Sequence, residues 1–204
     1  MAPDMQKRQR GVSRIFLATK NPGKAAELEE LLEPHGLHVV GPERMRDLPA
    51  PVEDGNTFRA NAVKKALHYS RLVDLPVLAD DSGLEVDALE GRPGVRSARL
   101  GGPSASDADR VRLVVSQLEG VPWEERTARF RCVIAMARDD VLLSEFTGSV
   151  EGRIAFEPAG AAGFGYDPLF YYEPAGMTFA EMTSEEKHRV SHRGQAFERA
   201  VGWL

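Results

Sequence analysis

The chain has 204 residues, of which 28% are charged and 42% hydrophobic, proportions typical of a globular domain rather than a disordered chain. Lys and Arg number 26 against 31 Asp and Glu, and the net charge of −5 opposes binding to nucleic acid through the overall field. The single cysteine, Cys132, excludes an internal disulfide and a metal site built from several cysteines.

No apolar run approaches the ~20 residues that span a bilayer, and the polar segment Met1–Gly11 lacks the apolar core of a signal peptide. We therefore expect a cytoplasmic protein that does not bind membranes. Residues 1–13 are expected to form a disordered tail. Residues 14–204 are expected to form a single domain, because this length suits one core, whole or divided into two lobes.

The first elements alternate between strand and helix. Arg14–Thr19 is short and apolar, as a strand buried on both faces is. Asn21 suits an N-cap and Pro22 the first helical position, so a helix is expected to follow and to stop near Gly36. A second short strand is expected at Leu37–Val40.

The next stretch repeats this pattern after a proline-rich loop at residues 42–56. Helical spacing of apolar residues predicts a helix over Thr57–Val73. Two strands are expected at Pro76–Ala79 and Leu84–Leu89. The intervening Asp80-Asp81-Ser82-Gly83 consists of residues that favour turns.

The second half predicts a different architecture, with long antiparallel strands rich in β-branched and aromatic residues. A capping box at Thr183–Glu186 opens one last helix. The expected elements are a loop at Gly91–Gly102, a helix at Ser106–Leu118, strands at Thr127–Ala137, Val141–Phe156 and Pro168–Tyr172, a turn at Asp139-Asp140 and a glycine-rich loop at Gly160–Asp167. Together the elements predict one mixed α/β fold, with two lobes and a cleft between them.

Two segments at strand ends suggest phosphate and metal chemistry. Thr19-x-Asn21-x-x-Lys24 joins a strand to a helix N-terminus, where free N–H groups and a lysine attract phosphate. Asp80 and Asp81 follow a buried strand, and adjacent carboxylates repel unless a cation such as Mg²⁺ lies near them. In a strand these neighbours point in opposite directions, so they need not bind one ion. A capped helix with an exposed lysine and an acidic turn are the alternatives.

Two later segments offer groups for a base. The glycines around Phe164 and Tyr166 allow close approach to a ligand, and either aromatic ring suits stacking on a base. Lys187, His192 and Arg193 offer donors to phosphate or to a carbonyl. His188 and His192 have the i, i+4 spacing of metal ligands on a helix, but zinc is not favoured without cysteines or an H-E-x-x-H pattern. A flexible loop and a solvated basic helix face are the alternatives.

Five ordered motifs resemble the inosine triphosphate pyrophosphatase family, the non-standard purine nucleoside triphosphate pyrophosphatases. The likeness runs from about Arg14 to the C-terminus. The motifs are Thr19-x-Asn21-x-x-Lys24, Ala79-Asp-Asp-Ser-Gly83-Leu, Pro93-Gly94-x-x-Ser97-Ala-Arg99, Gly163-Phe-Gly-Tyr-Asp167-Pro and Ser191-His-Arg193.

The resemblance implies an elongated α/β chain with a long central mixed sheet, two lobes and a substrate cleft. It also implies a homodimer and Mg²⁺-dependent hydrolysis of ITP, dITP and XTP to the nucleoside monophosphate and pyrophosphate. In nucleotide metabolism this reaction keeps deaminated purines out of DNA and RNA.

The resemblance also implies roles for individual residues. Asp81 matches the proton acceptor and a Mg²⁺ carboxylate, Glu53 resembles the second metal carboxylate, and Ser82 matches a substrate contact. The remaining substrate-binding positions are Thr19, Lys20, Asn21, Pro22, Gly23, Lys24, Phe164, Gly165, Tyr166, Asp167, Lys187, His192 and Arg193.

Two other functions stay open at this point. A different phosphohydrolase would cut another phosphate or act on standard nucleotides. A nucleotide-binding regulator would bind ITP and leave it intact, although a pure binder has no need of both Lys24 and a water-activating Asp81.

Overall fold

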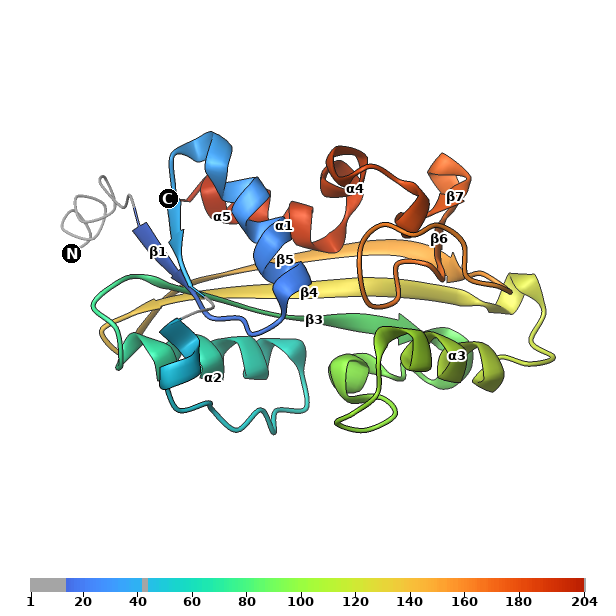
Figure 1. The fold of residues 1–204 in the computed structure, drawn as a ribbon, viewed down its shortest axis with the longest axis horizontal. Helices are drawn as coiled ribbons and strands as arrows, with labels where there is room; N and C mark the ends of the chain where they lie inside the picture. The colour runs from blue at the N-terminus through green and yellow to red at the C-terminus, as the bar shows by residue number, and fades with distance from the viewer. Residues whose placement is uncertain (1–13, 42–43, 204) are drawn as a thin grey trace. The chain divides into compact units, whose positions relative to one another are not determined.

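The computed structural model describes residues 14–41 and 44–203, so the predicted tail at residues 1–13 lies outside the described residues. Within them, seven strands form one sheet in the order β2-β1-β3-β4-β5-β6-β7 (Figure 1). β1 pairs in parallel with β2 and β3, whereas β5, β6 and β7 pair antiparallel. The predicted α/β fold with a mixed sheet is confirmed.

Most predicted elements are present within a few residues of the expected bounds. The strands are β1 (Arg14–Leu17), β2 (His38–Val40), β3 (Val77–Val86), β4 (Thr127–Arg138), β5 (Val141–Ile154), β6 (Phe170–Tyr172) and β7 (Met177–Thr178). The helices are α1 (Pro22–Leu32), α2 (Phe58–Ser70), α3 (Asp107–Gln117), α4 (Ser184–Val190) and α5 (His192–Val201). Short 3-10 turns lie inside two of the three predicted loops, at Arg44–Asp47 and Gly94–Arg99, and β7 was not predicted.

The chain divides into two compact units. The first unit contains the described residues up to Asp81, together with Val133–Thr147 and the C-terminal residues from Ala196. The second unit contains Ser82–Cys132 and Gly148–Gln195.

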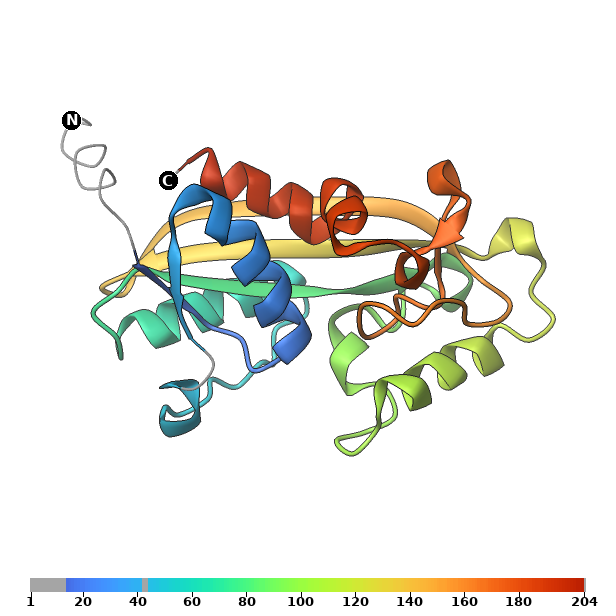
Figure 2. The same ribbon diagram turned by 45° about the horizontal axis from the view of Figure 1, so that its top comes forward.

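Local capping starts the helices of the first unit where the sequence predicts. The Asn21 side chain accepts a hydrogen bond from the Lys24 amide (3.1 Å), and Pro22 occupies the first turn. Thr57 caps α2 in the same way. α1 lies on one face of the strands and α2 on the opposite face, and the turned view of Figure 2 shows α5 on the same face as α1.

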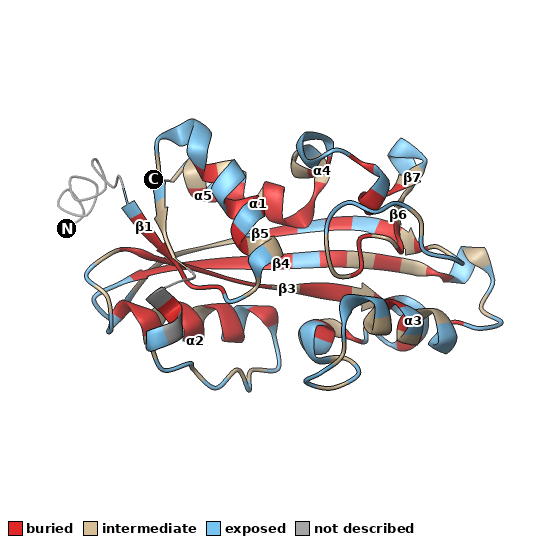
Figure 3. Ribbon diagram, viewed as in Figure 1, coloured by how far each residue is buried: buried red, intermediate tan, exposed pale blue. Residues whose placement is uncertain are grey.

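Aromatic packing dominates the core of the second unit. Phe130, Phe170 and Phe179 are buried, with ring centroids of 4.6 Å for Phe130–Phe170 and 4.9 Å for Phe170–Phe179. α3 begins at Ser106, where the helix was expected, with a capping box formed by Ser106 and Asp109. Figure 3 shows that the strands are buried over much of their length.

The structure corrects the predicted turn at Asp80–Gly83. β3 runs without interruption from Val77 to Val86, through residues whose local preference is for turns. Asp80 and Asp81 are both buried and ion-paired with lysines from flanking helices. Tertiary contacts therefore satisfy the carboxylates in the extended conformation and override the turn preference.

The predicted single last helix is also wrong, because it is two helices. Ser191 is extended (φ −72°, ψ 155°) and ends α4, and its hydroxyl accepts a hydrogen bond from the Gly194 amide (3.0 Å) at the start of α5. His188 and His192 therefore lie on different helices and lack the i, i+4 geometry of a metal pair. Gly194 permits the break, since a Cβ there would lie 1.8 Å from the His188 carbonyl oxygen.

We predict that Gly194→Ala destabilises the protein by about 2 kcal/mol or more, because the added methyl group forces α4 and α5 apart. Urea unfolding monitored by circular dichroism measures this. Gly202→Ala is the control, since a Cβ there makes only ordinary contacts, the nearest at 3.6 Å. Equal stability of the two variants would contradict the assignment.

Candidate functional site

The first polar cluster begins at the N-terminus of α1. Lys24 forms an ion pair with Asp80 across 2.9 Å, and the Asp80 side chain has no exposed surface. Thr19, just before the helix, accepts a hydrogen bond from the Asn21 amide (3.2 Å). The predicted phosphate-binding stretch therefore lies beside a buried carboxylate that holds its lysine.

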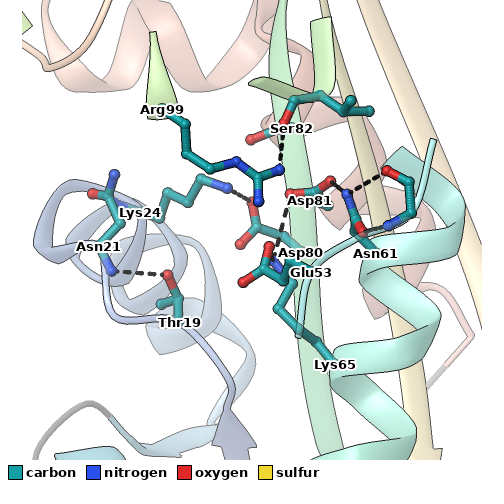
Figure 4. A network of polar contacts seen from close by, with 12 residues as sticks. Thr19, Asn21, Lys24, Glu53, Asn61, Lys65, Asp80, Asp81, Ser82 and Arg99 are labelled. Carbon is teal, nitrogen blue, oxygen red and sulfur yellow. Dashed lines mark hydrogen bonds and ion pairs between the residues drawn. The ribbon is translucent and has the colours of Figure 1, made fainter. Parts of the chain in front are cut away.

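Asp81 meets a different helix. The Asn61 side-chain amide donates to one of its carboxylate oxygens (3.2 Å), and the Lys65 ammonium lies 3.4 Å from the other. Figure 4 shows Lys24 approaching Asp80 from α1, whereas Asn61 and Lys65 come from α2. The two carboxylates thus point to opposite sides of β3, as predicted for neighbours in a strand.

The loop before α2 brings Glu53 to the same lysine. Its carboxylate lies 3.3 Å from the Lys65 ammonium, so Lys65 bridges Glu53 and Asp81. Asn61 also accepts a hydrogen bond from the Gly55 amide (2.8 Å), which fixes the loop. A Cβ at Gly55 would lie 2.6 Å from the Asn61 oxygen, so the close approach requires glycine.

Burial and charge act against each other in this cluster. Burial raises the pKa of Asp81, opposed by the positive charges of Lys65 and Lys24. Burial also disfavours the Lys65 ammonium, but the Asp81, Asp80 and Glu53 carboxylates outweigh it and raise the pKa of Lys65. Lys65 is therefore charged at neutral pH and stabilises the two carboxylates that lie beside it.

The donor set of this cluster fits a magnesium ion. Glu53 and Asp81 supply carboxylate oxygens on either side of the Lys65 ammonium. Among the described residues there is no group of three or more His, Cys, Asp or Glu side chains that would hold a metal. Mg²⁺ suits such a site, because it commonly uses one or two carboxylates together with substrate phosphates and water.

The second polar cluster surrounds the glycine-rich loop of the second unit. The Phe164 ring is half-buried, and the Lys187 ammonium and Arg193 guanidinium lie 5.0 and 5.5 Å from its centroid. Lys187 forms a buried ion pair with Asp167, which also accepts a hydrogen bond from the Phe164 amide (2.8 Å). The structure therefore brings together Phe164, Asp167, Lys187 and Arg193, which are far apart in the sequence.

His192 and Arg193 occupy the first turn of α5, and both are buried. The His192 ring stacks on Phe130, with 4.7 Å between centroids and 12° between planes. Arg193 donates a hydrogen bond to the Ser82 hydroxyl on β3 (2.9 Å). Packing and hydrogen bonding thus fix both side chains.

Sequence reasoning missed Asn61, Lys65 and the role of Asp80. Asn61 and Lys65 are i, i+4 on α2 and buried beside Phe58, Ala62 and Ala66. Two polar residues four apart on a buried helix face were the available signal. Their carboxylate partner is 16 to 20 residues further along the chain, a pairing that the spacing does not show.

Comparisons with known proteins agree with this geometry. The Ham1 family model matches residues 15–203, and the chain belongs to this family. It is 50% identical over 188 residues to a dITP/XTP pyrophosphatase of Desulforamulus reducens, with 92% of this chain and 94% of the relative covered. A dITP/XTP pyrophosphatase of Bacillus subtilis is 44% identical, with 92% and 95% covered.

Solved structures show the same fold. A HAM1 protein from Coxiella burnetii superposes with a TM-score of 0.83 at 42% identity, with 94% of this chain and 98% of that chain covered. The family resemblance inferred from the motifs is therefore confirmed. No helix in the described residues is long and apolar enough to cross a membrane.

We predict that Lys65→Met lowers the free energy of unfolding by about 3 kcal/mol, because two partly or wholly buried carboxylates lose their shared cation. Adding Asp81→Asn is expected to restore part of the loss. Chemical unfolding of the single and double variants measures both effects.

Lys64→Met provides the matched control. Lys64 is the neighbouring residue and pairs with Asp54 at the surface, so its loss is expected to leave the unfolding midpoint nearly unchanged. Equal effects at positions 64 and 65 would show that Lys65 does not compensate the buried carboxylates.

Proposed function

We propose that this chain hydrolyses non-standard purine nucleoside triphosphates (ITP, dITP and XTP) to the nucleoside monophosphate and pyrophosphate with Mg²⁺, and so cleanses the nucleotide pool. The observation that carries the proposal is the meeting of Glu53 and Asp81 at Lys65 beside a buried β3. The names of the relatives at 44–50% identity support the same substrate class.

The first cluster binds the triphosphate in this proposal. Lys24 and the positive end of the α1 helix dipole neutralise phosphate oxygens. Glu53 and Asp81 hold the metal, which when bound neutralises phosphate oxygens and the charge on the leaving group. Lys20, Pro22 and Gly23 complete the stretch that approaches the phosphates.

The chemical step is an attack of water on the α-phosphorus. Asp81 orients the water and accepts its proton as the new O–P bond forms. The bond from the α-phosphorus to the bridging oxygen breaks, and its electron pair leaves with pyrophosphate. Asn61 and Lys65 hold the Asp81 carboxylate in one orientation by contacting one oxygen each.

The second cluster binds the purine. Phe164 supplies a stacking surface, while Lys187, His192 and Arg193 offer donors to the C6 carbonyl of hypoxanthine or xanthine. Adenine carries an amino group at C6, so the same buried donors lose their acceptor. Ser82, Gly165 and Asp167 complete this set, and Tyr166 belongs to the same loop with its ring buried. A homodimer and a cytoplasmic location belong to the same proposal.

Pyrophosphate release from ITP, XTP, GTP and ATP tests the function. We expect release from ITP and XTP with Mg²⁺, little from ATP or GTP, and none with a chelator. Orthophosphate as the product would indicate a cut at another phosphate. Binding of ITP without turnover would indicate a regulator.

Asp81→Asn is expected to reduce kcat by at least a hundredfold and to leave ITP binding largely intact, because the amide does not accept the proton. Calorimetry of ITP binding and the pyrophosphate assay separate the two quantities. Asp54→Asn, a change at an exposed carboxylate, is the control. Wild-type turnover of the Asp81 variant would overturn its assignment.

His192→Ala is expected to lower the preference for ITP over ATP about tenfold, since one donor to the C6 carbonyl is lost. The ratio of kcat/KM values for the two nucleotides measures this. His35→Ala, at an exposed position, should leave the ratio unchanged. An equal slowing with both nucleotides would refute a role of His192 in selection.

A further inference from the structure

The Tyr166 side chain lies inside the core of the second unit rather than on the surface of the glycine-rich loop. It is 5% exposed, and its hydroxyl donates a hydrogen bond to the Ser97 carbonyl (2.8 Å). Burial raises the pKa of this phenol, so it stays a neutral donor near neutral pH. A ring so deeply buried offers little surface for stacking on a base.

Ser97 links this hydrogen bond to β3. Its hydroxyl accepts a hydrogen bond from the Leu84 amide (2.9 Å) and donates one to the Gly94 carbonyl (2.6 Å). Ser97 is itself buried. A continuous path therefore runs from Leu84 on β3, through the Gly94–Arg99 turn, to Tyr166 in the loop.

The same loop presents Phe164, two residues before Tyr166. Other contacts already restrain it: the Phe164 amide donates to Asp167, and the Gly165 amide donates to Asp107 at the start of α3 (2.8 Å each). Gly163 and Gly165 have φ values of 72° and 64°, which glycine adopts readily. The loop is thus rich in glycine and yet fixed at several points.

β3 also holds Arg193, the arginine beside Phe164, through a hydrogen bond. Arg193 donates to Ser82, which lies two residues before Leu84 on the strand. Phe164 and Arg193 are therefore both positioned from the Ser82–Leu84 segment. Their mutual distance, 5.5 Å from guanidinium to ring centroid, depends on both links.

We propose that Tyr166 is a positioning residue for purine binding. Its hydrogen bond to Ser97 holds the loop so that the Phe164 ring is in place to stack on the base. This proposal rests on the proposed function, because it assigns the loop to the purine. The proposal also assigns a role to the Pro93–Arg99 motif, because Ser97 within it connects β3 to the glycine-rich loop. Because the loop is already ordered, binding of the base does not have to supply the free energy of ordering it.

Tyr166→Phe tests the proposal by removing only the hydroxyl. We expect KM for ITP to rise about tenfold with kcat changed by less than about twofold, since the loss affects base positioning and not the phosphate cluster. Inhibition by IMP is expected to weaken by the same factor. Inhibition by inorganic tripolyphosphate, which has no base, is expected to stay unchanged.

Two further variants sharpen the result. Ser97→Ala breaks the link between Leu84 and the turn, and should reproduce the loss of IMP affinity with tripolyphosphate unaffected. Tyr172→Phe is the matched control, a half-buried tyrosine packed against the same core whose hydroxyl makes no hydrogen bond in the described part of the chain. It should change neither inhibitor.

The outcomes separate the two proposals. An unchanged IMP affinity in Tyr166→Phe overturns the positioning role while the function stands. Equal weakening of IMP and tripolyphosphate also overturns it, because that pattern indicates general structural damage. A wild-type protein that neither binds IMP nor hydrolyses ITP overturns the proposed function and the positioning role with it.

Discussion

The structure depends on two adjacent carboxylates in the interior of β3. Burying one ionised Asp side chain costs free energy unless a cation or several donors compensate its charge. Asp80 and Asp81 are both buried, and their negative charges also repel each other. The extended backbone places the two carboxylates on opposite faces of β3, because consecutive side chains of a strand point in opposite directions. Lys24 of α1 then compensates Asp80, and Lys65 of α2 compensates Asp81.

This compensation explains the arrangement of the first unit. α1 must begin where its lysine reaches Asp80, which the Asn21 cap and Pro22 ensure. α2 must turn Asn61 and Lys65 toward Asp81, and the same Asn61 fixes the loop that carries Glu53. The contacts that permit buried carboxylates therefore also bring together the groups to which we assign phosphate and metal binding.

The predictable parts of the fold were those that local chemistry decides. The caps at Asn21 and Thr183, and the long strands β4 and β5, follow from residues close in sequence. The continuous β3 did not, because Asp, Ser and Gly favour turns until distant lysines pair with them. The break between α4 and α5 depends on one carbonyl contact at Gly194, which no periodicity reveals.

The candidate site divides in the same way. Its residue types were recognisable as ordered motifs, whereas Asn61 and Lys65 entered only through contacts across 16 to 20 residues. Lys65 changes the expected charge of the site, because it places a positive charge beside carboxylates that the motifs show alone. Lys65 lies between the Glu53 and Asp81 carboxylates and Lys24 pairs with Asp80, so the charges of the first cluster are compensated by residues far apart in the sequence.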